Sequence, residues 1–317
     1  MKTFTAIEID YNRFKILEIH KKKHSYFLNN FVNEAIENLN YDDVNSVSIN
    51  LKKIIAENKI NIKNVFTSIN GNSVESFSFN LPVMPESDLK PAVEYELKKV
   101  LPFPVSQCIF DYIYIETADE SGNRALKITT FAVKEEYINK LKSIFDMSAI
   151  KIKSIECKTV SIYNNIRYLN KNKTGHLVLC DVGDKTVKIA IILNDAINFE
   201  RTADGLNLKN MDDETAAGVI AEELKRTIDF YFAGKSLPPI DGIILTGLFS
   251  GAKGFDAKIS DAVTLRAYSV SVLTLVKSEK YSFYLSKNLN KYNLKDNPEF
   301  FRPLEDMWTT FGLIINR

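Results

Sequence analysis

Cysteine and histidine are scarce in this 317-residue chain, and neither follows the spacing of a metal site. The three cysteines, Cys108, Cys157 and Cys180, lie far apart, and histidine occurs only three times. A sparse, odd number of cysteines is typical of reduced thiols in a cytosolic compartment rather than of a disulfide framework. We therefore expect no metal site and no catalytic group built on Ser–His–Asp or Cys–His.

Neither sign of charge is in surplus, because 41 basic and 40 acidic side chains leave a formal net charge of +1. Proteins that neutralise phosphates usually carry a basic excess, so we expect no nucleic-acid partner. The longest apolar runs, such as residues 189–193, are strand-length and fall well short of the roughly 20 residues that span a bilayer. The N-terminus lacks the apolar core of a signal peptide. The sequence therefore predicts a cytoplasmic protein without a direct membrane span.

Strand and helix patterns alternate along the chain and predict an α/β fold. Period-2 alternation at 4–10 and 14–19 is typical of a hairpin, and 65–69 and 240–245 are typical of buried strands. Apolar residues at helical spacing predict further elements, at 44–58, 134–145, 158–169, 214–232 and 304–315. Another helix is expected from about Ser87, whose hydroxyl would cap its first amides. It should end before the prolines of 101–104.

The two halves of the chain open in a similar way. Ile9-Asp10 with Lys15, and Cys180-Asp181 with Lys188, each place a strand, an aspartate, a turn and a lysine on the returning strand. Aspartate begins many turns, so the spacing of one hairpin alone decides nothing. Two such hairpins, one at the start of each half, favour a duplicated fold.

Several segments resemble a known family. They are Leu81-Pro82-Val83-Met84-Pro85, Glu94-Tyr95-Glu96, Leu101-Pro102-Phe103-Pro104, Phe110-Asp111-Tyr112, Phe131-Ala132-Val133-Lys134, Asp181-Val182-Gly183, residues 223–231 and residues 311–317. On these segments the sequence resembles the PilM family of type IV pilus assembly proteins, which has the actin-like ATPase fold and is related to FtsA. The Leu-Pro-Phe-Pro region is the most specific of them.

The resemblance implies a two-lobed, duplicated, ribonuclease H-like fold with an extra subdomain of the FtsA and PilM type. It divides the chain into the first lobe at 1–76, the inserted subdomain at 77–153, a helix and linker at 154–174, the second lobe at 175–300 and a returning C-terminal helix at 301–317. Only residues 206–222 separate Gly205 from Glu223. The small subdomain that the family carries there is therefore expected to be largely missing.

The resemblance also implies ATP and Mg²⁺ in the cleft, held by two turns rich in Gly, Ser or Thr, each with an aspartate. The second turn keeps this pattern in Asp181, Gly183 and Lys188. The first turn, from Asp10 to Lys15, has no Gly, Ser or Thr. Its aspartate and lysine lie five positions apart, whereas those of the second turn lie seven positions apart. We interpret this as a first hairpin shortened by two residues.

The adenosine side of that site is also altered. The family has consecutive glycines where this chain has scattered ones, represented by Gly247 and Gly251. We therefore predict a vestigial nucleotide site in a pseudo-ATPase that needs no cofactor. An ATP-dependent switch with bound Mg²⁺ is the alternative.

The resemblance implies a partner as well. In the family, the cytoplasmic tail of the inner-membrane protein PilN docks in a groove between the first lobe and the extra subdomain. We place the wall of that groove at Tyr95, Leu101, Phe103 and Tyr112. The expected function is a cytoplasmic scaffold, peripheral at the inner membrane through a PilN-like protein and other pilus or secretion components, including an assembly ATPase.

A cytosolic actin-like component of type II secretion is a further alternative. Those proteins normally continue into a transmembrane helix, whereas this chain ends at Arg317 without one. We therefore favour the separate pilus component.

Overall fold

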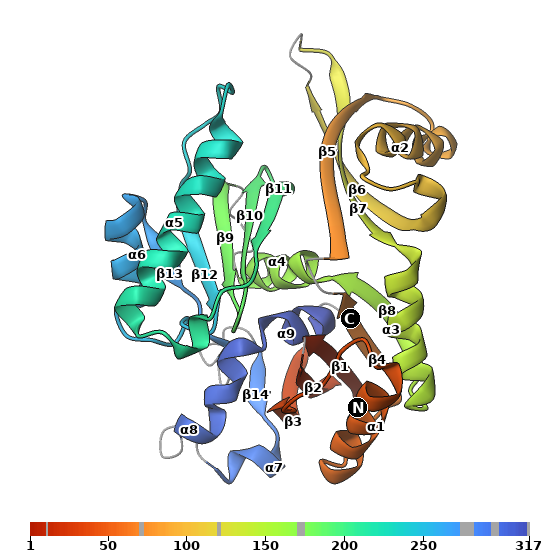
Figure 1. The fold of residues 1–317 in the computed structure, drawn as a ribbon, viewed down its shortest axis with the longest axis vertical. Coiled ribbons are helices and arrows are strands. Elements are labelled where there is room, and N and C mark those ends of the chain that lie inside the picture. The colour runs from red at the N-terminus through yellow and green to blue at the C-terminus, as the bar shows by residue number, and fades with distance from the viewer. Residues whose placement is uncertain are drawn as a thin grey trace.

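Three β-sheets organise the chain in the computed structural model, which describes residues 1–10, 12–69, 73–118, 122–169, 175–272, 282–292 and 298–315. The linker expected at 170–174 lies outside the described residues. The sheets have six, five and three strands (Figure 1).

The six-stranded sheet of the first lobe has the order β14-β3-β2-β1-β4-β8. Its strands are β1 (Lys2–Asp10), β2 (Arg13–Lys22), β3 (Ser25–Ala35), β4 (Val65–Ile69), β8 (Ile152–Cys157) and β14 (Phe283–Leu285). Helices α1 (Val44–Glu57) and α3 (Glu135–Met147) cover one face, where Val47, Leu51 and Phe145 pack on Ile7 and Phe14. The predicted N-terminal hairpin and both helices are confirmed.

The five-stranded sheet of the second lobe has the order β11-β10-β9-β12-β13. Its strands are β9 (His176–Val182), β10 (Val187–Leu193), β11 (Ala196–Ala203), β12 (Gly242–Gly247) and β13 (Ala267–Ser269). Helices α5 (Asp213–Phe232) and α6 (Phe255–Val263) cover its outer face. Only the 3₁₀ turn η3 (Leu208–Asn210) lies between β11 and α5, so no small helical subdomain is inserted there.

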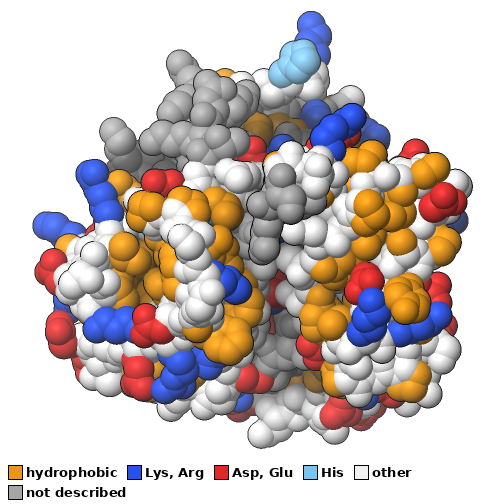
Figure 2. Space-filling model, turned by 90° about the horizontal axis from the view of Figure 1, so that it is seen from above, with side chains coloured by type: hydrophobic (Ala, Val, Ile, Leu, Met, Phe, Trp, Pro, Cys, Tyr) orange, Lys and Arg blue, Asp and Glu red, His pale blue; other side chains and the backbone are white. Residues whose placement is uncertain are grey.

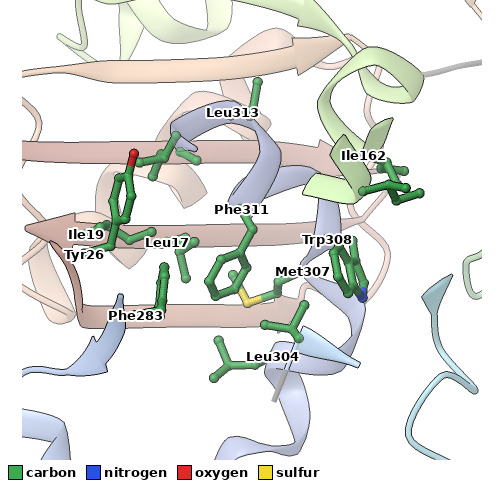
Figure 3. Close-up of a cluster of buried hydrophobic side chains, with 14 of the residues drawn as sticks. Leu17, Ile19, Tyr26, Ile162, Phe283, Leu304, Met307, Trp308, Phe311 and Leu313 are labelled. Carbon is green, nitrogen blue, oxygen red and sulfur yellow. The ribbon is translucent and has the colours of Figure 1, made fainter. Parts of the chain in front are cut away.

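Two helices fill the space between these sheets and join the lobes. Helix α4 (Lys158–Leu169) and helix α9 (Trp308–Ile314) share one apolar core with β1 and β2 on one side and with β9, β10 and β12 on the other. Figure 3 shows Phe311 of this core beside Leu17 of the first sheet, with Trp308 further along the same helix. Because helices cover both faces, the central strands are buried on both sides, which explains the nearly continuous apolar sequences of β10 and β12.

The C-terminal segment is less regular than predicted. A single helix at 304–315 is wrong, because the 3₁₀ turn η6 (Arg302–Asp306) precedes α9 and Met307 separates the two. Two short helices come before it, α7 (Lys287–Asn290) and α8 (Pro298–Phe301).

The three-stranded sheet has the order β5-β7-β6 and packs against one helix. Its elements are β5 (Val74–Pro82), α2 (Glu86–Val100), the 3₁₀ turn η2 (Val105–Gln107), β6 (Cys108–Ala118) and β7 (Arg124–Lys134). The predicted cap at Ser87 is wrong: α2 begins after Pro85 without a side-chain cap, and the Ser87 hydroxyl donates to Asp88. Glu86 and Asp88 place negative charge at the first turn instead, which favours the helix start through its dipole.

Gly312 marks the closest approach of the two central helices. A Cβ built on Gly312 of α9 would lie 1.7 Å from the carbonyl oxygen of Ser161 on α4. Any larger residue would therefore push these helices apart.

We expect Gly312→Ala to lower the free energy of unfolding by about 1–3 kcal/mol, because an added methyl group overpacks the helix crossing. Urea denaturation measures this change. Gly218→Ala on α5 is the matched control, since no atom lies within 4 Å of its Cβ position. It should be neutral or stabilise by up to about 1 kcal/mol, through helix propensity. If the two substitutions changed the free energy of unfolding equally, the close contact between α4 and α9 at Gly312 would be contradicted.

Candidate functional site

The strand register corrects the comparison of the two hairpins. Lys15 of β2 lies opposite Glu8 of β1, and Lys188 of β10 lies opposite Asp181 of β9. Glu8, rather than Asp10, is therefore the counterpart of Asp181, and each acid lies seven positions before its lysine. The predicted loss of two residues from the first hairpin is wrong.

The hairpins differ in how far their strands pair. In the first, pairing continues to Asp10 and Arg13, so only positions 11 and 12 connect the strands. In the second, residues 183–186 form a loop in which the Gly183 amide donates to the Thr186 carbonyl at 2.9 Å. Backbone amides bind phosphate when a loop leaves them free, and in the first hairpin strand pairing takes up Asp10 and Arg13, whose counterparts belong to the loop of the second.

A buried lysine lies between the two counterpart acids. The ammonium of Lys158, the first residue of α4, is 3.2 Å from Glu8 Oε1 and 3.4 Å from Asp181 Oδ2. Thr246 on β12 donates to the other Asp181 oxygen at 2.8 Å. Burial by itself lowers the pKa of Lys158, but Glu8 and Asp181 raise it well above its ordinary value. Lys158 is therefore charged and joins a carboxylate of each lobe.

The two hairpin lysines also pair with carboxylates of the protein. Lys15 Nζ lies 2.9 Å from Asp306 Oδ2, and Lys188 Nζ lies 3.4 Å from Glu200 Oε1. Burial lowers the pKa of Lys15, but Asp306 and Glu8 together raise it above its ordinary value. Neither lysine is thus a free cation directed at a phosphate.

Little space remains between the hairpins. Arg13 of the first forms an ion pair with Asp184 of the second at 3.0 Å. The pocket beside this pair is lined by Asp10, Lys15, Asp306 and the 184–186 turn among others, and its volume is about 30 Å³. Pockets for nucleotide-sized ligands hold roughly 300–1,000 Å³. The pocket at this junction is too small for a nucleoside triphosphate.

The two glycines expected near adenosine serve close packing within the chain. Gly247 has φ of +89°, and a Cβ there would lie 2.2 Å from the Val182 carbonyl oxygen. A Cβ on Gly251 would lie 2.8 Å from Glu305 Oε1. The lysines and Asp181 expected to hold ATP form ion pairs with other residues of the protein instead, and the two glycines lie against its backbone and side chains. In the described part of the chain, no group of three or more His, Cys, Asp or Glu side chains is arranged to hold a metal ion.

A second, larger site lies where the three-stranded sheet meets the first lobe. This groove has a volume of about 610 Å³ and runs between β6 and β8, with residues of β7, α3 and α4 also lining it. Its lining is mainly apolar, with Ile109, Ile113, Phe131, Val133 and Ile155 among the side chains. We call it the β6–β8 groove.

The structure separates the four residues predicted for the groove wall. Tyr112 belongs to the stretch of β6 that borders the β6–β8 groove, but its side chain packs against the α2 core on the other face of the strand. Tyr95 is 62% exposed on α2 beneath the Lys99 ammonium, Leu101 packs against the α2 core, and Phe103 lies under Lys134. These three lie outside the groove lining, although the groove itself lies where the resemblance implied. Sequence inspection missed Ile109 and Ile113, which the period-2 pattern of β6 places on the face opposite Tyr112.

The surface of the molecule seen from above is also partly apolar. Seen from above, hydrophobic side chains gather on both sides of a hollow between the α5 side and the α2 side of the molecule (Figure 2). The exposed apolar side chains of the three-stranded sheet and α2 include Val83, Tyr95, Val100 and Tyr114.

Comparison with known families decides the relationship. The family described as type IV pilus assembly protein PilM matches residues 6–207, more than half of the chain. The chain belongs to this family. No curated protein sequence matches it.

A solved structure described as the PilM-PilN type IV pilus biogenesis complex is similar to the chain over nearly its full length. Their TM-score is 0.74 at 14% identity, over 98% of this chain and 96% of that one. The predicted two-lobed actin-like fold is therefore confirmed.

Two other structures are less similar. The cytoplasmic domain of EpsL, an inner-membrane component of the type II secretion system of Vibrio cholerae, matches with a TM-score of 0.48 and 7% identity over 77% of this chain and 82% of that one. The ethanolamine utilization protein EutJ of Carboxydothermus hydrogenoformans also has a TM-score of 0.48 and 7% identity, over 99% of this chain and 89% of that one. At these TM-scores, neither match bears on the function. Among the described residues, no helix is long and apolar enough to cross a membrane.

The junction has a measurable pH dependence. Burial raises the pKa of Asp306 to about 6, although Lys15 lowers it, whereas the pKa of an unfolded aspartate is about 3.9. The folded chain therefore holds a proton that the unfolded chain releases between about pH 4 and 6. The stability that this proton contributes is present at about pH 4 and is lost as the pH rises through 6.

We expect the free energy of unfolding of the wild type, relative to Asp306→Asn, to fall by about 1–3 kcal/mol from pH 4 to pH 6. Urea titrations across this range measure the difference. Glu94→Gln, on the exposed face of α2, is the control and should leave the wild-type profile unchanged. If the free energies of unfolding of the wild type and Asp306→Asn changed in parallel with pH, the raised pKa of Asp306 would be refuted.

Proposed function

We propose that the chain is a cytoplasmic scaffold of a type IV pilus machine. It binds the N-terminal cytoplasmic tail of a PilN-like inner-membrane protein in the β6–β8 groove and does so without ATP turnover. This partner holds it at the inner membrane, where it also meets other components of the machine, including an assembly ATPase. The observation that carries the proposal is an apolar groove bordered by two sheet edges.

Both bordering strands are edges of their sheets. In the described part of the chain, β6 pairs only with β7 and β8 pairs only with β4. An edge strand presents backbone amides and carbonyls that an extended peptide can pair with. The apolar side chains between the two edges provide pockets for alternate side chains of such a peptide. The groove therefore suits a tail in extended conformation.

The partner's identity is supported by family membership and by the solved complex. The chain belongs to the PilM family, and the structure it resembles along 98% of its length is described as a PilM-PilN complex. The cytoplasmic tail of a membrane protein can bind as an extended peptide, which is the conformation that a groove between two sheet edges accepts.

The absence of ATP turnover is supported by the junction between the hairpins. Each lysine expected at a phosphate forms an ion pair with a carboxylate of the protein, and the pocket there measures about 30 Å³. In the first hairpin, strand pairing continues as far as Asp10 and Arg13. A scaffold needs only the two-lobed body and the groove, and both are retained.

We expect Ile113→Glu to weaken binding of the partner's N-terminal tail by at least about tenfold. Ile113 lines the groove, and a carboxylate there is desolvated by the bound peptide without compensation. Calorimetric titration with a synthetic tail peptide measures the dissociation constant. Because Ile113 is 43% exposed, the substitution should leave the fold intact.

Tyr114→Glu is the matched control for this experiment. Tyr114 is the next residue of β6, is 46% exposed and faces away from the groove. Its substitution should leave the dissociation constant unchanged. If both variants bind like the wild type, the tail does not bind in the β6–β8 groove, and an undetectable interaction with the wild type would refute the proposed function.

A further inference from the structure

Lys158 lies where the two lobes meet. Its ion-pair partners come from equivalent positions of the duplicated fold, since Glu8 is on β1 of the first lobe and Asp181 is on β9 of the second. All three side chains are nearly inaccessible: Glu8 is 1% exposed, Asp181 6% and Lys158 7%. The ammonium is thus enclosed by the protein.

Glu8 forms its ion pair with this ammonium, and the ammonium of Lys15, the residue opposite it on β2, also interacts with it electrostatically. Within the described residues, neither oxygen of Glu8 accepts a hydrogen bond, and its one ion pair is with Lys158. A buried carboxylate without a compensating charge carries a large desolvation penalty. Removing the ammonium would also leave Glu8 and Asp181 as two like charges close to one another.

A pair of carboxylates from two lobes is also an arrangement that suits a hydrated divalent cation, because Mg²⁺ binds through one or two carboxylates and keeps several waters. In this chain the ammonium already lies between them. The space that such a cation would need is therefore filled by a side chain of the protein.

We propose that Lys158 is a built-in substitute for a bound cation: its ammonium holds the two lobes together, so their arrangement requires neither nucleotide nor divalent metal. This inference deepens the proposed function, because it rests on the absence of ATP binding and adds the reason the scaffold keeps one shape. It also identifies Lys158 as the residue whose removal makes the lobes depend on an external cation.

The test compares three variants by thermal unfolding in the presence of a chelator. Lys158→Met keeps most of the side-chain volume and removes the charge, so we expect the melting temperature to fall by about 5 °C or more. A triple variant, Lys158→Met with Glu8→Gln and Asp181→Asn, removes the uncompensated carboxylates and should recover at least half of that loss. Lys98→Met, from an exposed pair with Glu94 on α2, is the control and should melt like the wild type.

The cation dependence provides the second measurement. Adding Mg²⁺ or Ca²⁺ should raise the melting temperature of Lys158→Met and leave that of the wild type within about 1 °C, since only the variant has a vacant place between the carboxylates. A wild-type melting temperature that rises on adding Mg²⁺ would overturn the inference. So would a variant Lys158→Met that melts like the wild type, or a triple variant no more stable than Lys158→Met.

Two outcomes separate this inference from the proposed function. If Lys158→Met does not fold, a folded triple variant still supports the charge argument, and an unfolded triple variant overturns it. Hydrolysis of Mg-ATP by the wild type would refute the absence of ATP turnover in the proposed function. Failure of the triple variant to recover, with no hydrolysis by the wild type, would refute only the role of Lys158.

Discussion

The burial of Lys158 between Glu8 and Asp181 is the constraint on which the rest of the structure depends. A buried ion pair offsets its desolvation only when its geometry is well held, because the Coulomb energy that compensates it falls with distance. Strands β1 and β9 and the start of α4 must therefore keep fixed relative positions. The shared core between the two sheets and the close helix crossing at Gly312 provide that rigidity.

The same rigidity extends to the three-stranded sheet. The hydroxyls of Ser78 and Thr129 donate to the Ile197 carbonyl of β11, at 3.2 and 2.8 Å, so this sheet contacts the second lobe as well as the first. The β6–β8 groove is thus formed on a body held at several points. Because bound partners lose less entropy on a preformed site, such a body suits a scaffold better than a cleft that opens and closes.

Much of the fold could be predicted from the sequence, since β1, β2, α1, α4 and α5 follow clear periodicities with their apolar faces buried. The contacts at the junction could not be predicted, because the role of Glu8 depends on strand register. From the sequence alone, Asp10 is the expected counterpart of Asp181, because it directly precedes the turn. Lys158 gave no local signal, as its partners are far away in sequence. The resemblance implied a partner groove between the first lobe and the extra subdomain, and the β6–β8 groove lies between these units. Its β8 wall is a sheet edge only because of the strand order, which spacing along the chain does not reveal.

The most direct measurement is the affinity of the wild-type chain for the N-terminal tail of its PilN-like partner, determined by calorimetry first without nucleotide and then with saturating Mg-ATP. A scaffold held closed by its own lysine predicts tight binding in the absence of nucleotide and the same dissociation constant when Mg-ATP is added. Binding that requires Mg-ATP, or that becomes at least about tenfold tighter with it, would contradict this view and would assign the chain the role of a nucleotide-controlled switch.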